Sequence, residues 1–265
     1  MGELVQVLTD RGLRRVVLVP QGLLSLLPLH AAWTKDPIPP TGRRYALDKI
    51  LFTYAPNALA LRACQITAAT SPIRTLFAVE DPTLKFSEDE VSAVLEHFQP
   101  VTDQTALGRP AVNREEVLSK LICAAPNVLH FATHGEAGFE NALQAGLTIA
   151  HGECLTLRDI LQLRLKHIRL AVLSACETGI PGTELPDEIV SLPTGLVQAG
   201  VAGVVGSLWA VDDVSTLLLM RHFYDLWRND GTEPSEALRQ AQIRLRDTTQ
   251  FDSPFYWAAF GYTGV

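Results

Sequence analysis

A histidine and a cysteine follow two short apolar runs of the sequence, and these two residue types can act together as a catalytic pair. His134 follows residues 127–133 (NVLHFAT), and Cys176 follows residues 168–174 (IRLAVLS) after one alanine. A cysteine attacks a carbonyl carbon as its thiolate, and a neighbouring imidazole can accept the thiol proton and later deliver it to a leaving amine. The pair therefore predicts acyl transfer through a thioester, the chemistry of peptide or amide hydrolysis.

The two apolar runs must form neighbouring strands if these side chains are to meet. The segment between His134 and Cys176 contains one predicted helix, at 156–165, which opens with Thr156 and Asp159 as a capping box. A strand, a helix and a second strand form a crossover unit with parallel strands, which lie about 4.8 Å apart. The carboxyl ends of parallel strands meet at one edge of the sheet, so we expect both side chains to emerge there.

Gly135, directly after the histidine, completes the predicted site. Because glycine has no Cβ, its backbone N–H can approach a substrate carbonyl closely. Together with the Cys176 N–H it can form an oxyanion hole, in which one donor contributes about 3 kcal/mol to transition-state stabilisation.

In the rest of the chain, apolar runs typical of strands alternate with amphipathic runs typical of helices. This alternation predicts an α/β domain with a mostly parallel sheet. The apolar runs predict further strands at 15–20, 50–55, 74–79, 202–208 and 255–262. Helix starts are predicted at Ser87 with Glu90, at Asn113 with Glu116, at Asp212 and at Ser235, and the last two helices should end near Arg228 and Arg246. Several strands are apolar on both faces, so we expect helices to cover both sides of the sheet.

Two segments read as loops. Residues 34–48 contain three prolines and a glycine, which predicts an irregular excursion. Residues 178–188 are rich in glycine and proline and follow Cys176, which predicts a mobile loop that faces the substrate.

The composition limits the classes of function that we consider. Of the 265 residues, 47% are hydrophobic and 19% are charged, and the formal net charge is −7. This balance predicts a globular domain with a sizeable core, without contact to nucleic acid or a membrane. The four cysteines form no CxxC pair, which argues against a zinc site or a disulfide framework. We therefore expect reduced thiols, a cytoplasmic protein and no cofactor.

Longer motifs resemble the CHAT family of caspase- and separase-like cysteine peptidases. The resemblance covers nearly the whole chain in the expected order, including VLHFATHGEA at 128–137, LAVLSACETG at 170–179, GLVQAGVAGVVGSLWAVDD at 195–213 and FYWAAFGYTG at 255–264. It implies a caspase-like, three-layer α/β/α fold in a single domain over residues 1–265. It is also compatible with that domain being part of a longer, sensor-linked protein.

The resemblance further implies roles for residues and partners. His134 would be the general acid and base, Cys176 the nucleophile, and the N–H groups of Gly135 and Cys176 the oxyanion hole. Members of the family include bacterial signalling and defence proteases coupled to helical-repeat or other sensor modules. The implied partners are thus a protein substrate and a regulatory sensor domain or subunit.

Related peptidases place an acidic residue after the strand that corresponds to 202–208, where it binds the substrate side chain. By this resemblance Asp213, or Asp212, lines a specificity pocket, although Ala210 stands where separases have an aspartate. Asp187 and Glu188, in the loop after Cys176, are second candidates for substrate binding.

Other interpretations of these residues remain open at this point. For Asp212 the favoured interpretation is that it caps the helix that follows it, which leaves Asp213 as the preferred pocket residue. His130 is interpreted as a packed or hydrogen-bonded core residue. The main alternative function is a catalytically silent module that keeps the fold as an interaction scaffold. A nucleotide-binding domain is a third reading, but the sequence has no phosphate loop.

Overall fold

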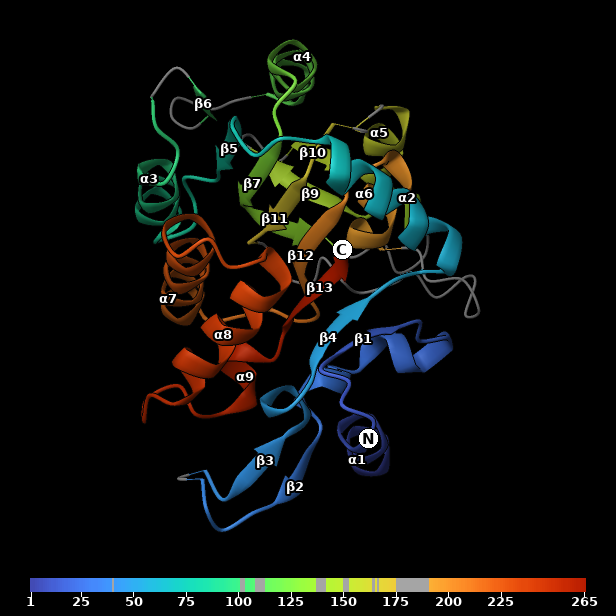
Figure 1. Cartoon of the computed structure of the whole chain (residues 1–265). Coiled ribbons are helices and arrows are strands. Elements are labelled where there is room, and N and C mark those ends of the chain that lie inside the picture. The colour runs from blue at the N-terminus through green and yellow to red at the C-terminus, as the bar shows by residue number, and fades with distance from the viewer. Residues whose placement is uncertain are drawn as a thin grey trace.

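The computed structural model describes residues 1–39, 41–100, 103–107, 113–136, 142–149, 153–163, 165, 167–174 and 191–265. Its centre is an eight-stranded sheet (Figure 1). The strands lie side by side in the order β1 (Arg15–Leu18), β4 (Leu51–Tyr54), β13 (Phe260–Gly264), β12 (Gly203–Ser207), β11 (Leu170–Leu173), β7 (Val128–Ala132), β5 (Leu76–Glu80) and β6 (Gln104–Leu107).

Strands β7 and β11 are parallel neighbours, as the two apolar runs predicted. Their register pairs Val128 with Leu170 and Phe131 with Leu173. Every residue of both strands is buried, because helices cover both faces of the sheet. Among the described strands of this sheet, every pair is parallel except β12 with β13. The mostly parallel α/β sheet is therefore confirmed.

Side chains alternate between the two faces of the sheet, and each face packs against its own group of helices. On β5, Leu76 and Ala78 contribute to one hydrophobic cluster, whereas Phe77 and Val79 contribute to the other. The first cluster includes helices α3 (Ser87–Glu96), α7 (Asp213–Tyr224), α8 (Pro234–Arg246) and α9 (Pro254–Trp257), and the second includes α2 (Ala58–Thr70), α4 (Arg114–Ala124), α5 (Leu157–Gln162) and α6 (Leu192–Ala199) (Figure 1). The predicted three-layer α/β/α arrangement is confirmed.

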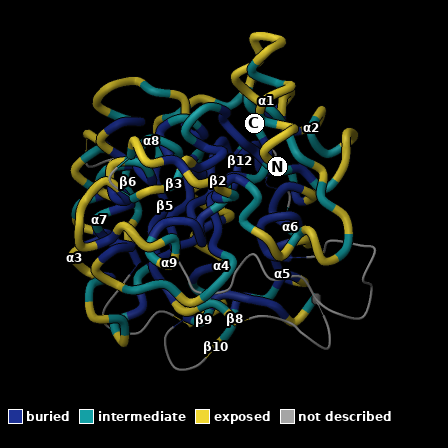
Figure 2. The backbone as a smooth tube through the Cα atoms, turned by 90° about the horizontal axis from the view of Figure 1, so that it is seen from below, coloured by how far each residue is buried: buried dark blue, intermediate teal, exposed yellow. Residues whose placement is uncertain are grey.

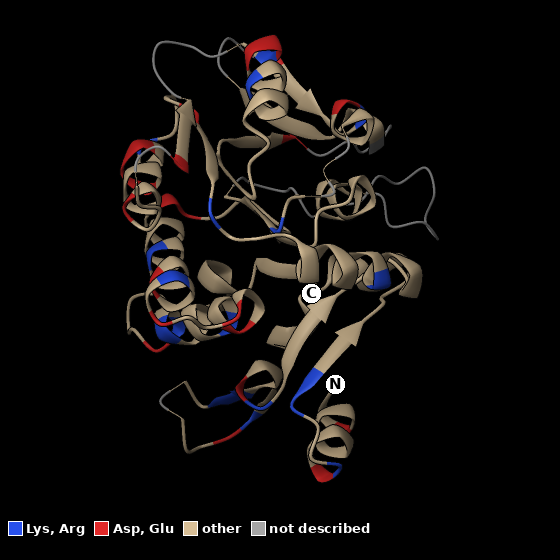
Figure 3. Ribbon diagram, turned by 45° about the horizontal axis from the view of Figure 1, so that its top comes forward, with Lys and Arg blue, Asp and Glu red and all other residues tan. Residues whose placement is uncertain are grey.

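Burial and charge follow these layers. The buried backbone gathers at the centre of the molecule, and the exposed backbone lies on outer helices and loops (Figure 2). Lys, Arg, Asp and Glu lie mostly on the outer helices and on the β2–β3 hairpin, with few on the central strands (Figure 3). No helix in the described ranges combines the length and the apolar character needed to cross a membrane.

Residues 255–262, predicted as one strand, are divided between a helix and a strand. The helix α9 covers Pro254–Trp257, and β13 begins at Phe260. Ser253 accepts a hydrogen bond from the first turn, and proline favours the first position of a helix. The strand prediction was wrong here because these local start signals outweigh the apolar pattern. Trp257, the last residue of α9, is fully buried.

Three predicted helix starts are confirmed. The side chains of Asn113, Thr156 and Asp212 each accept a hydrogen bond from a backbone N–H three residues further on. The helix after Asp212 is regular to Tyr224 and continues as one π-helical turn over Asp225–Asn229. The helix therefore extends to its predicted end near Arg228, and its winding changes from α to π after Tyr224.

At two helix starts the predicted capping residue is wrong. Helix α3 begins at Ser87 as predicted, but the Ser87 hydroxyl donates to the Asp81 carbonyl at 2.7 Å instead of capping the helix. The Glu90 carboxylate, its expected capping partner, turns into the core. Helix α8 begins at Pro234, so Ser235 is already its second residue.

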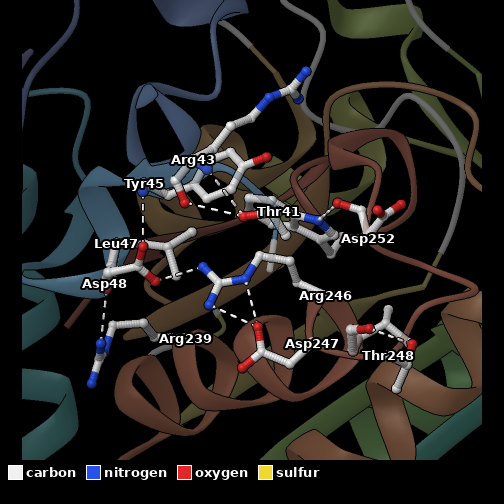
Figure 4. Close-up of polar contacts among 12 residues, drawn as sticks. Thr41, Arg43, Tyr45, Leu47, Asp48, Arg239, Arg246, Asp247, Thr248 and Asp252 are labelled. Carbon is white, nitrogen blue, oxygen red and sulfur yellow. Dashed lines mark hydrogen bonds and ion pairs between the residues drawn. The ribbon is translucent and has the colours of Figure 1, made fainter. Parts of the chain in front are cut away.

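Residues 34–48, predicted as an irregular excursion, contain an antiparallel hairpin of β2 (Trp33–Lys35) and β3 (Arg43–Tyr45), followed by the 3-10 turn Ala46–Asp48. Asp48 fastens this segment to α8. One carboxylate oxygen accepts from the Tyr45 N–H at 2.8 Å, and the other accepts from Arg246 Nη1 at 2.5 Å (Figure 4). The segment is therefore a hairpin whose end is anchored to α8.

A second, antiparallel sheet of three strands lies beyond β7. Its order is β10 (Glu153–Thr156), β9 (Gly146–Ile149) and β8 (His134–Glu136). The remaining elements are α1 (Gly2–Asp10) and the 3-10 helices Gly22–Leu26, Leu29–Ala31 and Ala142–Gln144. This small sheet receives the chain directly after β7 and so fixes the backbone of the predicted catalytic histidine.

Candidate active site

His134 is the first residue of β8, two positions beyond the buried end of β7. Its backbone pairs with Thr148 of β9, and Gly135 pairs with Leu147. The His134 side chain is exposed, whereas Thr133 just before it is buried. Among the residues that the structure describes, the imidazole has no hydrogen-bond or ion-pair partner. The ring is therefore available to a group that approaches this edge of the sheet.

Cys176, Asp187 and Glu188 lie outside the described residues, as does the predicted loop 178–188. The described chain after β11 ends at Ser174, two positions before the cysteine. Their roles, and the dyad itself, stay predictions.

A pocket lies beside the ends of β7 and β11, on the face that α3 and α7 cover. Its empty space, open to solvent, is about 380 Å³. Thr133 and Ser174 line it from the strand ends, Glu90 from α3, and Asp213 and Thr216 from α7. Because Thr133 immediately precedes His134, this pocket adjoins the predicted site of catalysis.

Asp212 and Asp213 differ in their surroundings. The Asp212 carboxylate accepts from the Ser215 N–H at 2.9 Å and so caps α7, which is the structural role considered for it above. Asp213 is exposed and lines the pocket. The structure thus brings one of the two aspartates to the pocket, while the carboxylate of the other is bound to a helix end.

The floor of the pocket is made of buried polar groups. Glu90 is 5% exposed, Ser174 is 6% exposed and Thr216 is 5% exposed. Within the described part of the chain, Ser174 Oγ and Thr216 Oγ1 are buried without any hydrogen-bond partner. An unsatisfied buried hydroxyl costs about 1–3 kcal/mol, so such groups gain when a polar ligand or water reaches them.

His130 links the Glu90 carboxylate to α7. His130 is fully buried, its Nε2 lies 3.0 Å from Glu90 Oε1, and its Nδ1 lies 3.1 Å from the Tyr224 hydroxyl. Burial, together with the nearby Glu90 charge, raises the pKa of Tyr224 well above its usual range, so the phenol keeps its proton. The expectation that His130 is a hydrogen-bonded core residue is confirmed.

Sequence reasoning missed Glu90, Ser174 and Thr216 as residues of this pocket. Helical periodicity carries a signal for Glu90, because it lies four positions before the buried Val94 and so shares the inward face of α3. A carboxylate on an apolar helix face needs a partner, and that requirement marks it for attention. Ser174 similarly continues the alternation of Leu170 and Val172 on one face of β11.

The whole chain matches a family model. The model of the CHAT domain matches residues 2–264. A search of curated proteins gives no match. The resemblance that the sequence motifs indicated is therefore confirmed.

Solved structures that superpose on this chain include cysteine peptidases. Separase, in a Saccharomyces cerevisiae separase–securin complex, superposes with a TM-score of 0.68 at 14% identity, over 96% of this chain and 15% of separase. The Arg-specific cysteine proteinase gingipain R superposes with a TM-score of 0.68 at 9% identity, over 99% of this chain and 66% of that one. A complex of Porphyromonas gingivalis RgpB pro- and mature domains superposes with a TM-score of 0.67 at 10% identity, over 99% of this chain and 67% of that one.

This chain thus spans a small part of separase and about two thirds of the gingipain chains. At these identities the likeness concerns the fold, which is that of the caspase-like cysteine peptidases. With the family model matched from end to end and this fold beneath it, the chain belongs to the CHAT family.

Proposed function

We propose that this chain is a cysteine endopeptidase that hydrolyses a peptide bond in a protein partner, with His134 and Cys176 as its catalytic pair. One observation carries the proposal: β7 and β11 are parallel neighbours in which Phe131 pairs with Leu173. His134 and Cys176 each stand three positions after these paired residues in the sequence. The cysteine-peptidase fold of the structural neighbours supports the same assignment.

The reaction follows from the chemistry of the two side chains. His134 takes the thiol proton, and the Cys176 thiolate attacks the carbonyl carbon. The N–H groups of Gly135 and Cys176 donate to the oxyanion that forms. Collapse of the tetrahedral intermediate breaks the C–N bond, and the imidazolium gives its proton to the leaving amine. Water then attacks the thioester with His134 as base, which releases the new carboxylic acid and restores the thiol.

Substrate recognition is proposed for the pocket beside the strand ends. Asp213 at its mouth is the preferred contact for the substrate side chain that precedes the scissile bond, with Asp187 and Glu188 as further candidates. Asp212 ranks below them because its carboxylate already caps α7. We further propose that a sensor domain or subunit controls the activity, as in relatives of this family.

Peptide cleavage tests the catalytic pair. Wild-type chain, Cys176→Ala, His134→Ala and the control Cys123→Ala are incubated with a proteome-derived peptide library, and new termini are identified by mass spectrometry. Cys123 is an exposed thiol of α4, away from the pocket, so its loss should leave cleavage unchanged. We expect no cleavage by Cys176→Ala and a fall of about 10²–10⁴-fold for His134→Ala. Equal cleavage by all four proteins would contradict the proposal.

Alkylation of Cys176 distinguishes a catalytic His134–Cys176 pair from a catalytically silent scaffold, and it needs no substrate. The rate at which iodoacetamide modifies Cys176 is measured between pH 5 and 9, with exposed Cys123 of the same chain as the reference thiol. We expect Cys176 to react faster than Cys123 near pH 6, because a neighbouring imidazole stabilises the thiolate. His134→Ala should remove this advantage. The same profile in wild type and in His134→Ala would favour the scaffold reading.

A further inference from the structure

Strand β1 forms one edge of the eight-stranded sheet, and among the described strands it pairs with β4 alone (Figure 1). The carbonyl groups of Arg14 and Leu18 accept hydrogen bonds from β4 and from the residue that follows it. Because successive residues of a strand turn their backbone groups to opposite edges, residues 14, 16 and 18 face β4. Arg15 and Val17 therefore turn their N–H and C=O groups to the open side of the sheet.

These outward backbone groups are available to another chain. No described residue forms a hydrogen bond with the N–H or the C=O of Arg15, Val17 or Val19. Arg15 and Val19 are exposed, and Val17 is half-buried. A row of unpaired backbone groups at the edge of a sheet is a template for a further strand. An extended peptide that lies along β1 would therefore find donors and acceptors at the spacing of a β-ladder.

Exposed apolar side chains flank this edge at both ends. Leu13 precedes the strand and is 47% exposed, and Val19 follows it and is 44% exposed. Leu23 and Leu24 belong to the 3-10 helix Gly22–Leu26 that comes next, and they are 80% and 54% exposed. Removing this apolar surface from water is favourable. The flanks of the edge therefore favour a partner segment that carries apolar side chains.

The charge of this part of the chain indicates the kind of partner. Residues 1–49 contain seven Lys or Arg and four Asp or Glu, whereas the rest of the chain contains 15 and 25, so the net charges are +3 and −10. Arg11, Arg14 and Arg15, at the start of β1, are all exposed, and none forms an ion pair with a carboxylate of the described residues. A second copy of the chain would bring the same basic groups to the interface, whereas an acidic segment would be attracted.

We propose that the open edge of β1 binds an extended segment of a partner protein, rich in apolar side chains and carboxylates, and that this segment adds one antiparallel strand to the sheet. Antiparallel pairing is the more stable arrangement per residue. It places the carboxylates at the carboxyl end of the segment, beside Arg14 and Arg15. This interaction is independent of the proposed peptidase activity, because β4, β13 and β12 lie between β1 and the strand that leads to Cys176.

Peptides that differ only in backbone methylation test the strand pairing. The probe is a short fluorescent peptide of alternating valine and threonine that ends in two glutamates, and its binding to the wild-type chain is measured by fluorescence anisotropy. Two further peptides are N-methylated at the odd or at the even amides, and only one of these sets faces β1. We expect that set to weaken binding about tenfold or more, because backbone donors are lost, and the other set to change it little. Equal affinities of the two methylated peptides, or no binding of the unmodified one, would overturn the inference.

A peptide with the same residues in reverse order tests the direction of the added strand. Its glutamates lie at the amino end, away from the arginines, so we expect several-fold weaker binding than for the first peptide. The double variant Arg14→Gln, Arg15→Gln should lose this preference. Arg158→Gln removes the same kind of charge from an exposed position on α5, away from β1, and should keep it (Figure 1). Equal binding of both peptides by the wild-type chain would contradict the proposed direction.

Amide hydrogen exchange, followed by NMR spectroscopy, locates the bound peptide on the strand. We expect the peptide to slow exchange of the Val17 N–H, which faces outward, much more than that of the Val16 N–H, which faces β4. Val17→Pro removes the outward N–H alone, and proline is tolerated at such a position of an edge strand, so this variant should bind the peptide at least several-fold more weakly. Protection elsewhere with Val17 unchanged would overturn the inference. The methylated peptides keep the test valid if Val17→Pro fails to fold.

Surface variants and the oligomeric state complete the test. Leu23→Ser should weaken peptide binding, whereas Ile122→Ser, at a position of α4 that is 64% exposed, should not. Equal effects of the two variants would contradict a role for the apolar flank. Sedimentation of the chain without peptide should show no dimer. A dimer that Val17→Pro abolishes would identify a second copy as the occupant of the edge and would overturn the proposal of an acidic partner.

Discussion

His30 shows how strongly the position of one residue decides its chemistry. It lies in a short 3-10 helix between strands, yet it is 5% exposed, and its Nδ1 lies 2.8 Å from the Tyr54 hydroxyl. Burial lowers the pKa of His30 to about 4, and a hydrogen bond with the Ala258 backbone opposes this shift only partly. The ring is therefore neutral in the folded protein at neutral pH, and charging it opposes folding.

We expect His30 to make the folded protein less stable in acid. Because the folded pKa of His30, about 4, lies below the unfolded value of 6.5, its contribution to stability is present above pH 6.5 and is lost as the pH falls toward 4. Over that window the loss is about 3 kcal/mol at most. Urea denaturation from pH 7 to 4 should show a shallower decline for His30→Gln than for wild type. If the free energy of unfolding fell equally with pH in both proteins, His30 would not be a cause of the acid sensitivity.

Glu90 shows where residue patterns mislead. A serine followed three positions later by a glutamate is the local signature of a capping box, and residues 87–90 carry it. The real partner of Glu90 is His130, forty positions away in the sequence, and only the packing of α3 against β7 brings them together. Thr156 and Asp159 carry the same pattern and do form a capping box, although Asp159 also pairs with Arg114, which lies far from it in the sequence.

At the scale of elements, contacts between segments far apart in sequence hold the N-terminal hairpin to the C-terminal helix. Arg246 of α8 contacts both Asp48 and its neighbour Asp247, and Arg239 donates to the Leu47 carbonyl at 2.8 Å (Figure 4). The hydrogen bonds raise the pKa of Arg246 although its burial opposes this. Nothing in the local sequence of residues 46–48 announces this connection, because its partner lies about two hundred positions later.

A double-mutant cycle measures this anchor. Asp48→Asn weakens the contact with a mostly buried guanidinium, and we expect it to lower the free energy of unfolding by about 2 kcal/mol. Asp247→Asn is the matched control, because Asp247 is 58% exposed and its ion pair should contribute less than about 1 kcal/mol. The cost of Asp48→Asn combined with Arg246→Gln should be smaller than the sum of the single costs. Additive costs in urea denaturation would mean that the pair is not coupled.

For the whole molecule, the sequence predicts the architecture better than the site. Apolar runs at 127–133 and 168–174 show where the central strands lie because both faces of those strands are buried. The pocket is different, because its floor combines side chains from α3, β11's end and α7. In the sequence, nothing distinguishes these residues from other helix and strand residues. Only the tertiary arrangement brings them together to line one pocket.

Hydrogen exchange tests how evenly this architecture is held together. The ladder between β4 and β13 consists of the single pair Tyr54 and Thr263, whereas β5 and β7 share five pairs. Amides of β1 and β4 should therefore exchange by an opening of lower free energy than amides of β7 and β11. Mass spectrometry of exchanged peptides would give this order, and one common rate for both groups would contradict it.

The single residue pair Tyr54–Thr263 between β4 and β13 also affects how a mechanical load would be transmitted through the protein. A force applied to the first fifty residues would act on the pair between β4 and β13 and on the Asp48–Arg246 contact before it acts on the strands that lead to His134. A load on this flank would therefore act first on the Tyr54–Thr263 pair and on the Asp48–Arg246 contact, whereas β7 is held to β5 by five residue pairs, so we expect the strand that leads to His134 to deform later.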